Sequence, residues 1–333
     1  MNTDFLKNKT ILLTGATGLI GSNLVDRLMD VEGIHVIAVG RNKEKLDNTF
    51  LKYLGNKKLT VIAHDMSKSL PSFDKDIDII YHAAGPMEGN IIRNYPVDVV
   101  LPNINGIINC LDLLRKQKKD GKKNGRLVVF SSVTVYNNIT NRDIDVCEED
   151  TNISECLGSA SISYSESKRM SEVIADSYTK QFDIDVVKAR FSTVYGFTKN
   201  IPDTAFYEFI KKGINGEDII LNSDGTKRRD NIFIEDAITG LITITENGIK
   251  GEAYNISSNG ELGNYASVDE IASKIVHFSN LSYGYNMKLR FKNNIGTRAV
   301  GLKLDNSKLK SLGWKITTSL DQGILKTMNY YKL

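Results

Sequence analysis

The sequence has few of the residues that build metal sites and disulfide frameworks. Its 333 residues include 3 cysteines and 4 histidines. No pair among Cys110, Cys147 and Cys156 has C-x-x-C spacing, and no histidine cluster accompanies them. We therefore expect no metal site, and the sparse, odd number of cysteines favours a reducing compartment.

A surplus of one charge is also lacking. The chain carries 43 basic and 40 acidic residues, for a net charge of +3, which gives no reason to expect a nucleic-acid partner. The basic run Arg115–Lys123 is interpreted as a solvated loop. No apolar stretch approaches the roughly 18 residues that cross a bilayer, and the N-terminal apolar run is too short for a signal peptide. We expect a cytoplasmic protein that binds neither nucleic acid nor membrane.

What the first half of the chain does contain is an alternation of β-branched runs and amphipathic segments. The predicted helices are Leu19–Met29, Val97–Lys116 and Tyr164–Phe182. The predicted strands are Thr10–Thr14, His35–Val39, Leu59–Ala63, Asp78–His82, Arg126–Ser131 and Asp185–Arg190. Apolar strands separated by helices indicate a parallel sheet with helices on both faces. This pattern predicts an α/β fold of the Rossmann type, with a doubly wound sheet.

The regular alternation of strands and helices ends at about Phe197. Helices are predicted at Ile201–Lys212, Ile234–Glu246, Ser267–Phe278 and Ser319–Tyr331, and strands at Ile219–Leu221, Ala253–Ile256 and Lys288–Phe291. Such a mixture indicates a smaller mixed α/β C-terminal lobe that binds substrate at the carboxyl edge of the sheet. We assign residues 1–196, with a returning segment at about 232–258, to a dinucleotide-binding domain. Residues 197–231 and 259–333 form the expected substrate-binding lobe.

A glycine-rich turn joins the first strand to the first helix. In TGATGLIGSNL (residues 14–24), Gly15 permits the turn, Gly18 admits a pyrophosphate, and Gly21 allows the helix to pack on the strand. The helix N-terminus supplies a positive end for the anion. Because the triplet follows a strand and opens a helix, it predicts dinucleotide binding.

The end of the second strand bears on which dinucleotide binds. A carboxylate at this position would accept the ribose hydroxyls of NAD, but the sequence has Gly40, Arg41 and Asn42. Arg41 would suit the 2′-phosphate of NADP, which is therefore preferred over NAD, although an arginine there could also stack on adenine. Asp65, past the third strand, is expected to meet the adenine edge.

Tyr164 and Lys168 are the candidate catalytic pair. At i and i+4 on a helix they share one face. Tyrosine has an ordinary pKa of about 10, and a nearby ammonium and nicotinamide would lower it, so that the phenolate could exchange a proton with a hydroxyl group. Ser132, at the end of the fifth strand, could hydrogen-bond the same oxygen.

These residues resemble the extended short-chain dehydrogenase/reductase family, in its NAD(P)-dependent epimerase/dehydratase branch that acts on nucleotide sugars. The resemblance runs from the glycine turn to about Trp314. Its further motifs are His82-Ala83-Ala84, residues 103–106 (NING), 132–136 (SVTVY), 164–168 (YSESK), 190–196 (RFSTVYG) and 228–234 (RRDNIFI).

The resemblance implies roles for individual residues. Ser132, Tyr164 and Lys168 would form a catalytic triad. The implied cofactor contacts are Gly15, Thr17, Gly18, Leu19, Ile20, Gly21, Asp65, Met66, Ala83, Ala84, Asn103, Tyr164, Lys168 and Phe191, with Arg41 added from the argument above. The implied substrate contacts are Thr134, Thr193, which stands where the family usually has asparagine, and Arg229 and Arg298, which would bind the diphosphate.

Branches of the family differ just before residues 135–136 (VY). The 4,6-dehydratases carry an Asp-Glu pair where this chain has Val133 and Thr134, and the decarboxylases carry glutamate in place of Thr134. The 3,5-epimerase-reductases need a Cys/His pair that is not found. SVTVY resembles the SATVY of 4-epimerases, although Asn137 replaces the glycine that usually follows.

The prediction is a nucleotide-sugar 4-epimerase that transiently oxidises its substrate to a keto sugar. The alternative is an NADPH-dependent nucleotide-sugar ketoreductase or dehydrogenase, which Arg41 favours. A non-catalytic dinucleotide-binding regulator is the alternative of another class. By the same resemblance, the helices 97–116 and 164–182 pair with their copies in a four-helix homodimer interface.

Overall fold

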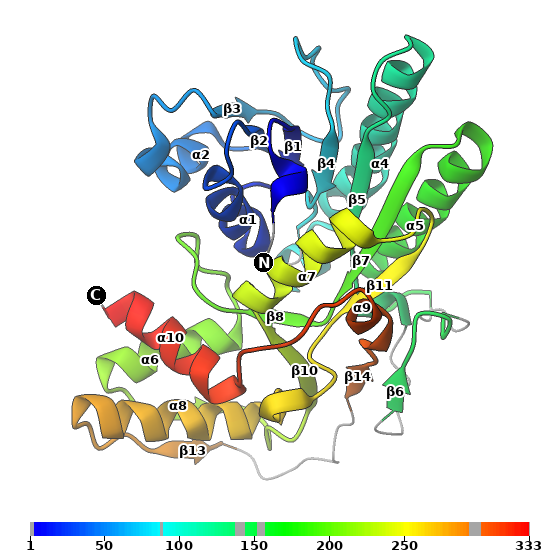
Figure 1. Ribbon diagram of the computed structural model, residues 1–333. Helices are drawn as coiled ribbons and strands as arrows, with labels where there is room; N and C mark the ends of the chain where they lie inside the picture. The colour runs from blue at the N-terminus through cyan, green and yellow to red at the C-terminus, as the bar shows by residue number, and fades with distance from the viewer. Residues whose placement is uncertain (1–2, 87–88, 137–143, 152–156, 293–300, 333) are drawn as a thin grey trace.

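The computed structural model describes residues 3–86, 89–136, 144–151, 157–292 and 301–332. Its largest element is a parallel sheet of 7 strands in the order β11-β7-β5-β4-β1-β2-β3 (Figure 1). The strands are β1 (Thr10–Thr14), β2 (His35–Gly40), β3 (Leu59–Ala63), β4 (Ile79–His82), β5 (Arg126–Ser132), β7 (Asp185–Phe191) and β11 (Ala253–Ile256). This order confirms the doubly wound, Rossmann-type sheet.

Two hydrophobic cores, one on each face of the sheet, explain why the strands are apolar throughout. Successive side chains of a strand point to opposite faces. In β1, Ile11 and Leu13 belong to the core covered by α1 (Leu19–Met29) and α7 (Ile234–Asn247). Leu12 belongs to the core covered by α4 (Pro96–Lys119) and α5 (Ile162–Phe182).

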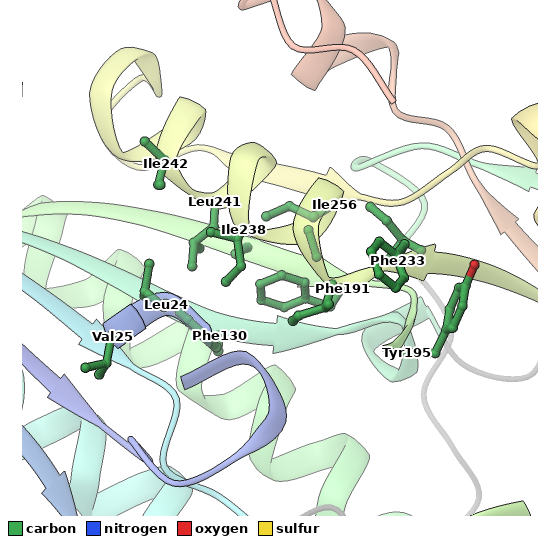
Figure 2. Close-up of a cluster of buried hydrophobic side chains, with 14 of the residues drawn as sticks. Leu24, Val25, Phe130, Phe191, Tyr195, Phe233, Ile238, Leu241, Ile242 and Ile256 are labelled. Carbon is green, nitrogen blue, oxygen red and sulfur yellow. The ribbon is translucent and has the colours of Figure 1, made fainter. Parts of the chain in front are cut away.

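The first core extends under the carboxyl ends of β5 and β7. Figure 2 shows Phe130 and Phe191 between side chains of α1 and α7, and their ring centroids lie 5.1 Å apart. The neighbouring residues in this view are Leu24, Val25, Ile238, Leu241, Ile242 and Ile256. Because interiors are close-packed, the strand ends that carry Ser132 and Phe191 are held in fixed positions.

The smaller sheets lie mostly in the second half of the chain. One has the order β12-β10-β8, and two others pair β13 with β9 and β14 with β6. Their strands are β6 (Ile144–Val146), β8 (Thr193–Tyr195), β9 (Ile219–Leu221), β10 (Arg228–Phe233), β12 (Tyr265–Ser267), β13 (Leu289–Phe291) and β14 (Leu302–Leu304). The helices of this part are α6 (Ala205–Asn215), α8 (Val268–Tyr283), α9 (Ser307–Ser311) and α10 (Leu320–Lys332). The predicted mixed α/β lobe is confirmed.

Short helices complete the described chain. They are α2 (Lys43–Thr49), α3 (Gly89–Asn94) and the 3-10 turns Asp4–Leu6, Leu51–Tyr53, Val133–Tyr136 and Glu261–Gly263.

Several predicted segments have different bounds in the structure, and two of these differences have a clear physical cause. The helix predicted at Ile201–Lys212 begins only at Ala205, because Thr204 has the extended backbone of an N-cap (φ −137°, ψ 157°). The basic run Arg115–Lys123 is not wholly a loop, since α4 continues to Lys119. Cations in the last turn of a helix stabilise its negative end, which accounts for the extension.

Helix α4 also departs from the expectation about membranes. By length and composition it could cross a bilayer, whereas the sequence analysis expected no such segment. Its buried residues, which include Ile107, Leu111 and Leu114, belong to the core beneath the sheet. A core helix of an α/β protein meets the same criterion, so α4 is only weak evidence for a membrane.

Candidate active site

The glycine turn forms a cradle that side chains would fill. Gly15 has φ +68°, and a Cβ on it would lie 2.6 Å from the carbonyl oxygen of Ala83. A Cβ on Gly21 would overlap the carbonyl oxygen of Gly15. Both positions therefore require glycine for conformation or close approach, as predicted.

The first turn of α1 has free backbone donors. Gly18 is its N-cap, and the first backbone bond within the helix runs from Ser22 N–H to Gly18 O, at 2.9 Å. Within the described part of the chain, the N–H groups of Leu19 and Ile20 have no protein acceptor. Thr17 is fixed nearby, because the Asn200 amide donates to its carbonyl oxygen at 3.0 Å. Free N–H groups at the positive end of a helix fit the pyrophosphate of a dinucleotide.

The loop after β4 lies against this turn. Ala84 N–H donates to Thr14 Oγ1 at 3.2 Å, and the same hydroxyl contacts His82 Nδ1 at 2.9 Å. Burial, aided by the charge of Lys168, lowers the pKa of His82 to about 3, so the imidazole is neutral. Ala83 and Ala84 are thereby held beside Gly15, where the sequence predicted cofactor contacts.

Arg41 and Asp65 follow the adjacent strands β2 and β3, whose ends are in register at Gly40 and Ala63. Both side chains are exposed. The backbone N–H of Ser67 donates to Asp65 at 2.9 Å and lowers the pKa of that carboxyl, and the charge of Arg41 adds to this effect. The two predicted contacts for the adenosine end therefore lie together, while Met66 is buried beneath them.

The catalytic candidates meet where α5 crosses the end of β5. Lys168 is buried and its Nζ donates to the carbonyl oxygen of Phe130 at 2.7 Å. The same Nζ lies 5.8 Å from the ring centroid of Tyr164. Ser132 ends β5 and lies beside the Tyr164 hydroxyl, whose pKa it lowers. The structure therefore brings together the three residues that the sequence assigned to catalysis.

Burial sets the charges of this group. It lowers the pKa of Lys168 to about 8, against the opposing charge of Glu172. Burial also raises the pKa of Tyr164, although the hydrogen bond with Ser132 opposes the rise. A phenolate at Tyr164 therefore depends on positive charge beside it, which the Lys168 ammonium supplies.

Asn103 lies against the loop after β4, since a Cβ on Gly85, next to Ala84, would lie 2.5 Å from its Oδ1. It is almost fully buried on α4, and its amide nitrogen donates to Val99 O at 2.9 Å and to Ser167 Oγ at 3.0 Å. Both amide hydrogens are thus used within the protein. Asn103 therefore joins α4 to α5 at Ser167, the residue before Lys168.

The predicted substrate contacts lie past the sheet. Thr134 follows Ser132, donates its N–H to Ser132 Oγ at 3.2 Å, and has a buried hydroxyl with no partner in the described part of the chain. Thr193 on β8 is half-buried and is next to β10, the strand that carries Arg229. Phe191, which was predicted as a cofactor contact, is buried at the end of β7. Arg298 lies outside the described residues.

One buried group of this region was missed by sequence reasoning. Glu172 lies one turn beyond Lys168 on α5 and is paired with Arg190 on β7. The i+4 spacing from Lys168 was the available signal, since residues at that spacing share a helix face.

Comparisons with known proteins agree with this geometry. Residues 11–257 match the model of the NAD dependent epimerase/dehydratase family. UDP-glucuronic acid decarboxylase 3 of Arabidopsis thaliana is 28% identical over 320 residues, which cover 95% of this chain and 87% of that protein.

Solved structures of similar fold include two epimerases. UDP-glucuronic acid 4-epimerase from Bacillus cereus, in complex with UDP-glucuronic acid and NAD, has a TM-score of 0.77 at 25% identity, covering 97% of this chain and 99% of that one. UDP-glucose 4-epimerase from Thermotoga maritima, with UDP-glucose, also has a TM-score of 0.77, at 21% identity, covering 97% and 98%.

The family model covers well over half of the chain, from β1 to the residue after β11. The prediction of a nicotinamide-dependent enzyme is confirmed at the level of the family. This chain belongs to the NAD dependent epimerase/dehydratase family.

Proposed function

We propose that this protein is a nucleotide-sugar 4-epimerase. The observation that carries the proposal is the single acid–base group at the end of β5, where Tyr164, Lys168 and Ser132 meet. One such group is sufficient for oxidation and reduction at one carbinol carbon. The bound nicotinamide supplies hydride acceptance and return.

The chain's own residues handle the proton. Tyr164, as the phenolate, takes the proton of the substrate hydroxyl, and Ser132 orients both oxygens by hydrogen bonding. Lys168 stabilises the phenolate through its ammonium charge. When the keto sugar presents its other face, the phenol returns the proton to the new alkoxide, so that the cycle is redox-neutral.

Elimination of water would need a second acid and base next to this group. The two residues after Ser132 are Val133, which is apolar, and Thr134, whose hydroxyl is a poor acid or base near neutral pH. The buried Thr134 Oγ1 lacks a protein partner in the described chain, and an unsatisfied buried hydroxyl of this kind calls for a partner. These features support epimerisation over dehydration.

The proposed substrate is a nucleotide-diphosphate sugar. The similar epimerases of solved structure hold UDP-glucuronic acid and UDP-glucose. Arg229 supports the same class here, since burial lowers the pKa of its guanidinium and no carboxylate of the described residues forms an ion pair with it. We propose that Arg229 binds the diphosphate, with Thr193 on the adjacent strand contacting the substrate and Arg298 as a second diphosphate contact.

An NADPH-dependent ketoreductase is the second candidate, because Arg41 stands at the end of β2 without a carboxylate. Our proposal of NADP rather than NAD as the cofactor depends on the same residue, Arg41. The B. cereus enzyme binds NAD, and the preference for NADP rests on Arg41 alone. A non-catalytic regulator is the third candidate, and the presence of both Tyr164 and Lys168 argues against it.

One incubation tests these candidates. The purified protein is mixed with UDP-glucose, or with UDP-glucuronic acid, without added cofactor, and the products are identified by proton NMR and mass spectrometry. We expect the 4-epimer at unchanged mass, and a loss of at least about a hundredfold in turnover for Tyr164→Phe. Loss of carbon dioxide from UDP-glucuronic acid would identify a decarboxylase. Turnover only with added NADPH would identify a reductase.

Undiminished turnover in Tyr164→Phe would contradict the catalytic assignment itself. A suitable control is Tyr178→Phe, because Tyr178 lies on the same helix and its hydroxyl donates to Asp112 at the surface. This control should keep full turnover.

We also propose a homodimer formed through α4 and α5. The two helices pack side by side (Figure 1) and carry apolar side chains that face outward. Val97 and Leu101 are 62% and 41% exposed, and Met170 and Val173 are 49% and 55% exposed. Their i, i+4 and i, i+3 spacings place each pair on one helix face. Burying such faces against a second copy would form a four-helix bundle.

A further inference from the structure

Successive turns of α5 contact the end of β5. Tyr164 and Lys168 account for two of these turns, and the Lys168 ammonium donates to Phe130 O. One turn further, Glu172 accepts a hydrogen bond from Ser131 Oγ. Glu172 is therefore part of the same seam between helix and strand, although the reaction proposed above gives it no task.

An arginine on the neighbouring strand binds this carboxylate with two hydrogen bonds. Arg190 is the register partner of Ser131 on β7. Its Nε lies 2.9 Å from Glu172 Oε1, and its Nη2 lies 2.6 Å from Oε2. Only 7% of Glu172 and 6% of Arg190 are exposed. Burial opposes ionisation of the carboxyl, but the bonds from Arg190 and Ser131 outweigh it and hold the pKa of Glu172 below its usual value.

Arg190, which clamps the Glu172 carboxylate, is itself held by hydrogen bonds on the side away from Glu172. Arg190 Nη1 donates to the Tyr136 hydroxyl at 3.0 Å and to Glu148 O at 2.6 Å. The Tyr136 hydroxyl in turn donates to Asn255 Oδ1, on β11, at 2.6 Å. Because these buried groups satisfy one another, the carboxylate is fixed relative to the sheet.

Among the residues that the structure describes, the other titratable groups near Lys168 do not supply a countercharge. Tyr164 lies on the same helix, and His82 on β4 is neutral, as shown above. Burial lowers the pKa of Lys168, and the negative charge of Glu172 opposes this effect. Without Glu172, Lys168 would lose its proton at a still lower pH. A buried ammonium that must stay charged needs such an anion.

We propose that Glu172 is a positioning residue whose clamped carboxylate supplies the buried countercharge that keeps Lys168 an ammonium beside Tyr164. The proposal rests on the assignment of Tyr164 and Lys168 as the catalytic pair. Glu172 acts through Lys168 and does not touch substrate or cofactor. Without its charge, Lys168 would also face the unpaired Arg190 cation, and both effects favour loss of the lysine proton.

The test measures Lys168 directly. Protein labelled with ¹³C at lysine Cε is titrated by NMR, and the Lys168 signal is assigned by its loss in Lys168→Met. In Glu172→Gln we expect the titration midpoint of Lys168 to move down by about one pH unit. The alkaline limb of the kcat profile should move in the same direction, with KM changed less than twofold.

Two further variants separate charge from shape. Glu172→Asp keeps the negative charge, so the titration midpoint of Lys168 should stay close to its wild-type value. Asp176→Asn removes a carboxylate one turn further along α5, which pairs with Lys188 on the same strand as Arg190. This matched control should leave the Lys168 midpoint unchanged.

If Glu172→Gln fails to fold because Arg190 is left unpaired, the double variant Glu172→Gln/Arg190→Gln removes both charges. In this double variant the titration midpoint of Lys168 should move down by less than the roughly one pH unit expected for Glu172→Gln. An unchanged Lys168 midpoint in a folded variant overturns the proposal, whatever its activity. Undiminished turnover in Tyr164→Phe would instead overturn the proposed reaction and leave the titration interpretable.

Discussion

At the scale of single residues, Gly15 shows how one missing side chain shapes the site. Its φ of +68° is unfavourable for other residues, and the carbonyl of Ala83 occupies the space of a Cβ. A side chain at this position would therefore cause backbone strain and a steric overlap together. The overlapping group is a backbone carbonyl, which cannot rotate away as a side chain can.

We expect Gly15→Ala to lower the free energy of unfolding by about 2–4 kcal/mol and to weaken cofactor binding. The matched control is Gly55→Ala, because Gly55 has φ +78° and no atom within 4 Å of its added Cβ. Urea unfolding and cofactor titration of both variants measure the difference. Equal losses in the two variants would show that the contact with Ala83 is unimportant.

Arg41→Ala tests the choice between the two dinucleotides. If the guanidinium binds a 2′-phosphate, its loss should weaken NADP(H) about tenfold to a hundredfold and NAD(H) hardly at all, since charge-assisted bonds contribute about 1.5–3 kcal/mol. Calorimetric titration with each cofactor gives the ratio. Lys43→Ala is the control, as Lys43 is an exposed cation nearby that pairs with Asp47. A similar loss for both cofactors would remove the preference for NADP.

At the scale of elements, periodicity predicted the main sheet well. β1, β3 and α1 have the predicted bounds, because buried parallel strands and an amphipathic helix have strong patterns. β10 was recognised as a motif but not as a strand, since Asp230 and Asn231 are unusual in strands. Their burial depends on partners distant in sequence, such as Ser258 and Asn264, which no local pattern contains.

The candidate site was predicted to a similar extent. Tyr164 and Lys168 were found because i, i+4 spacing fixes their geometry before any tertiary structure is known. The Glu172–Arg190 pair was not found, because it depends on the packing of α5 across β7. Asn103 was found, but its bonds to Val99 and Ser167 could be seen only in the structure.

The proposed pairing of α4 and α5 with a second copy is tested by Val173→Glu. A charge buried in the centre of an apolar interface is costly, so the variant should be a monomer by light scattering at concentrations where the parent protein is a dimer. Leu281→Glu on α8 is the control, since Leu281 is 73% exposed away from these helices. A monomeric parent protein would exclude the proposed dimer.

At the scale of the whole molecule, Asp230 joins β10 to distant segments. Its Oδ1 accepts a bond from Ser258, which follows β11, and its Oδ2 accepts the N–H of Leu304 in β14 at 3.0 Å. Burial raises the pKa of Asp230 to about 6, and these bonds only partly oppose the rise. Three regions of the chain therefore meet at a carboxyl group that resists ionisation.

The pKa of Asp230 predicts a pH dependence of stability. Because the folded pKa lies above the unfolded one, the stabilisation is complete below about pH 4 and is lost as the pH rises through about 6. Between pH 4 and 7 the wild type should lose about 2 kcal/mol relative to Asp230→Asn, which does not titrate. Urea unfolding at a series of pH values measures the difference. If the difference in unfolding free energy between the two proteins did not vary with pH, the raised pKa of Asp230 would be contradicted.

The chain leaves the large sheet after β7 and returns to it only with β11, which pairs with β7 as the last strand at that edge. During synthesis on the ribosome, β7 therefore emerges long before its outer neighbour. Until Ile256 has left the exit tunnel, the nascent protein exposes a row of unpaired N–H and C=O groups along β7, which is a template for pairing with other chains. Fragments that end before β11 should consequently aggregate, and the sheet becomes complete only when β11 has been made.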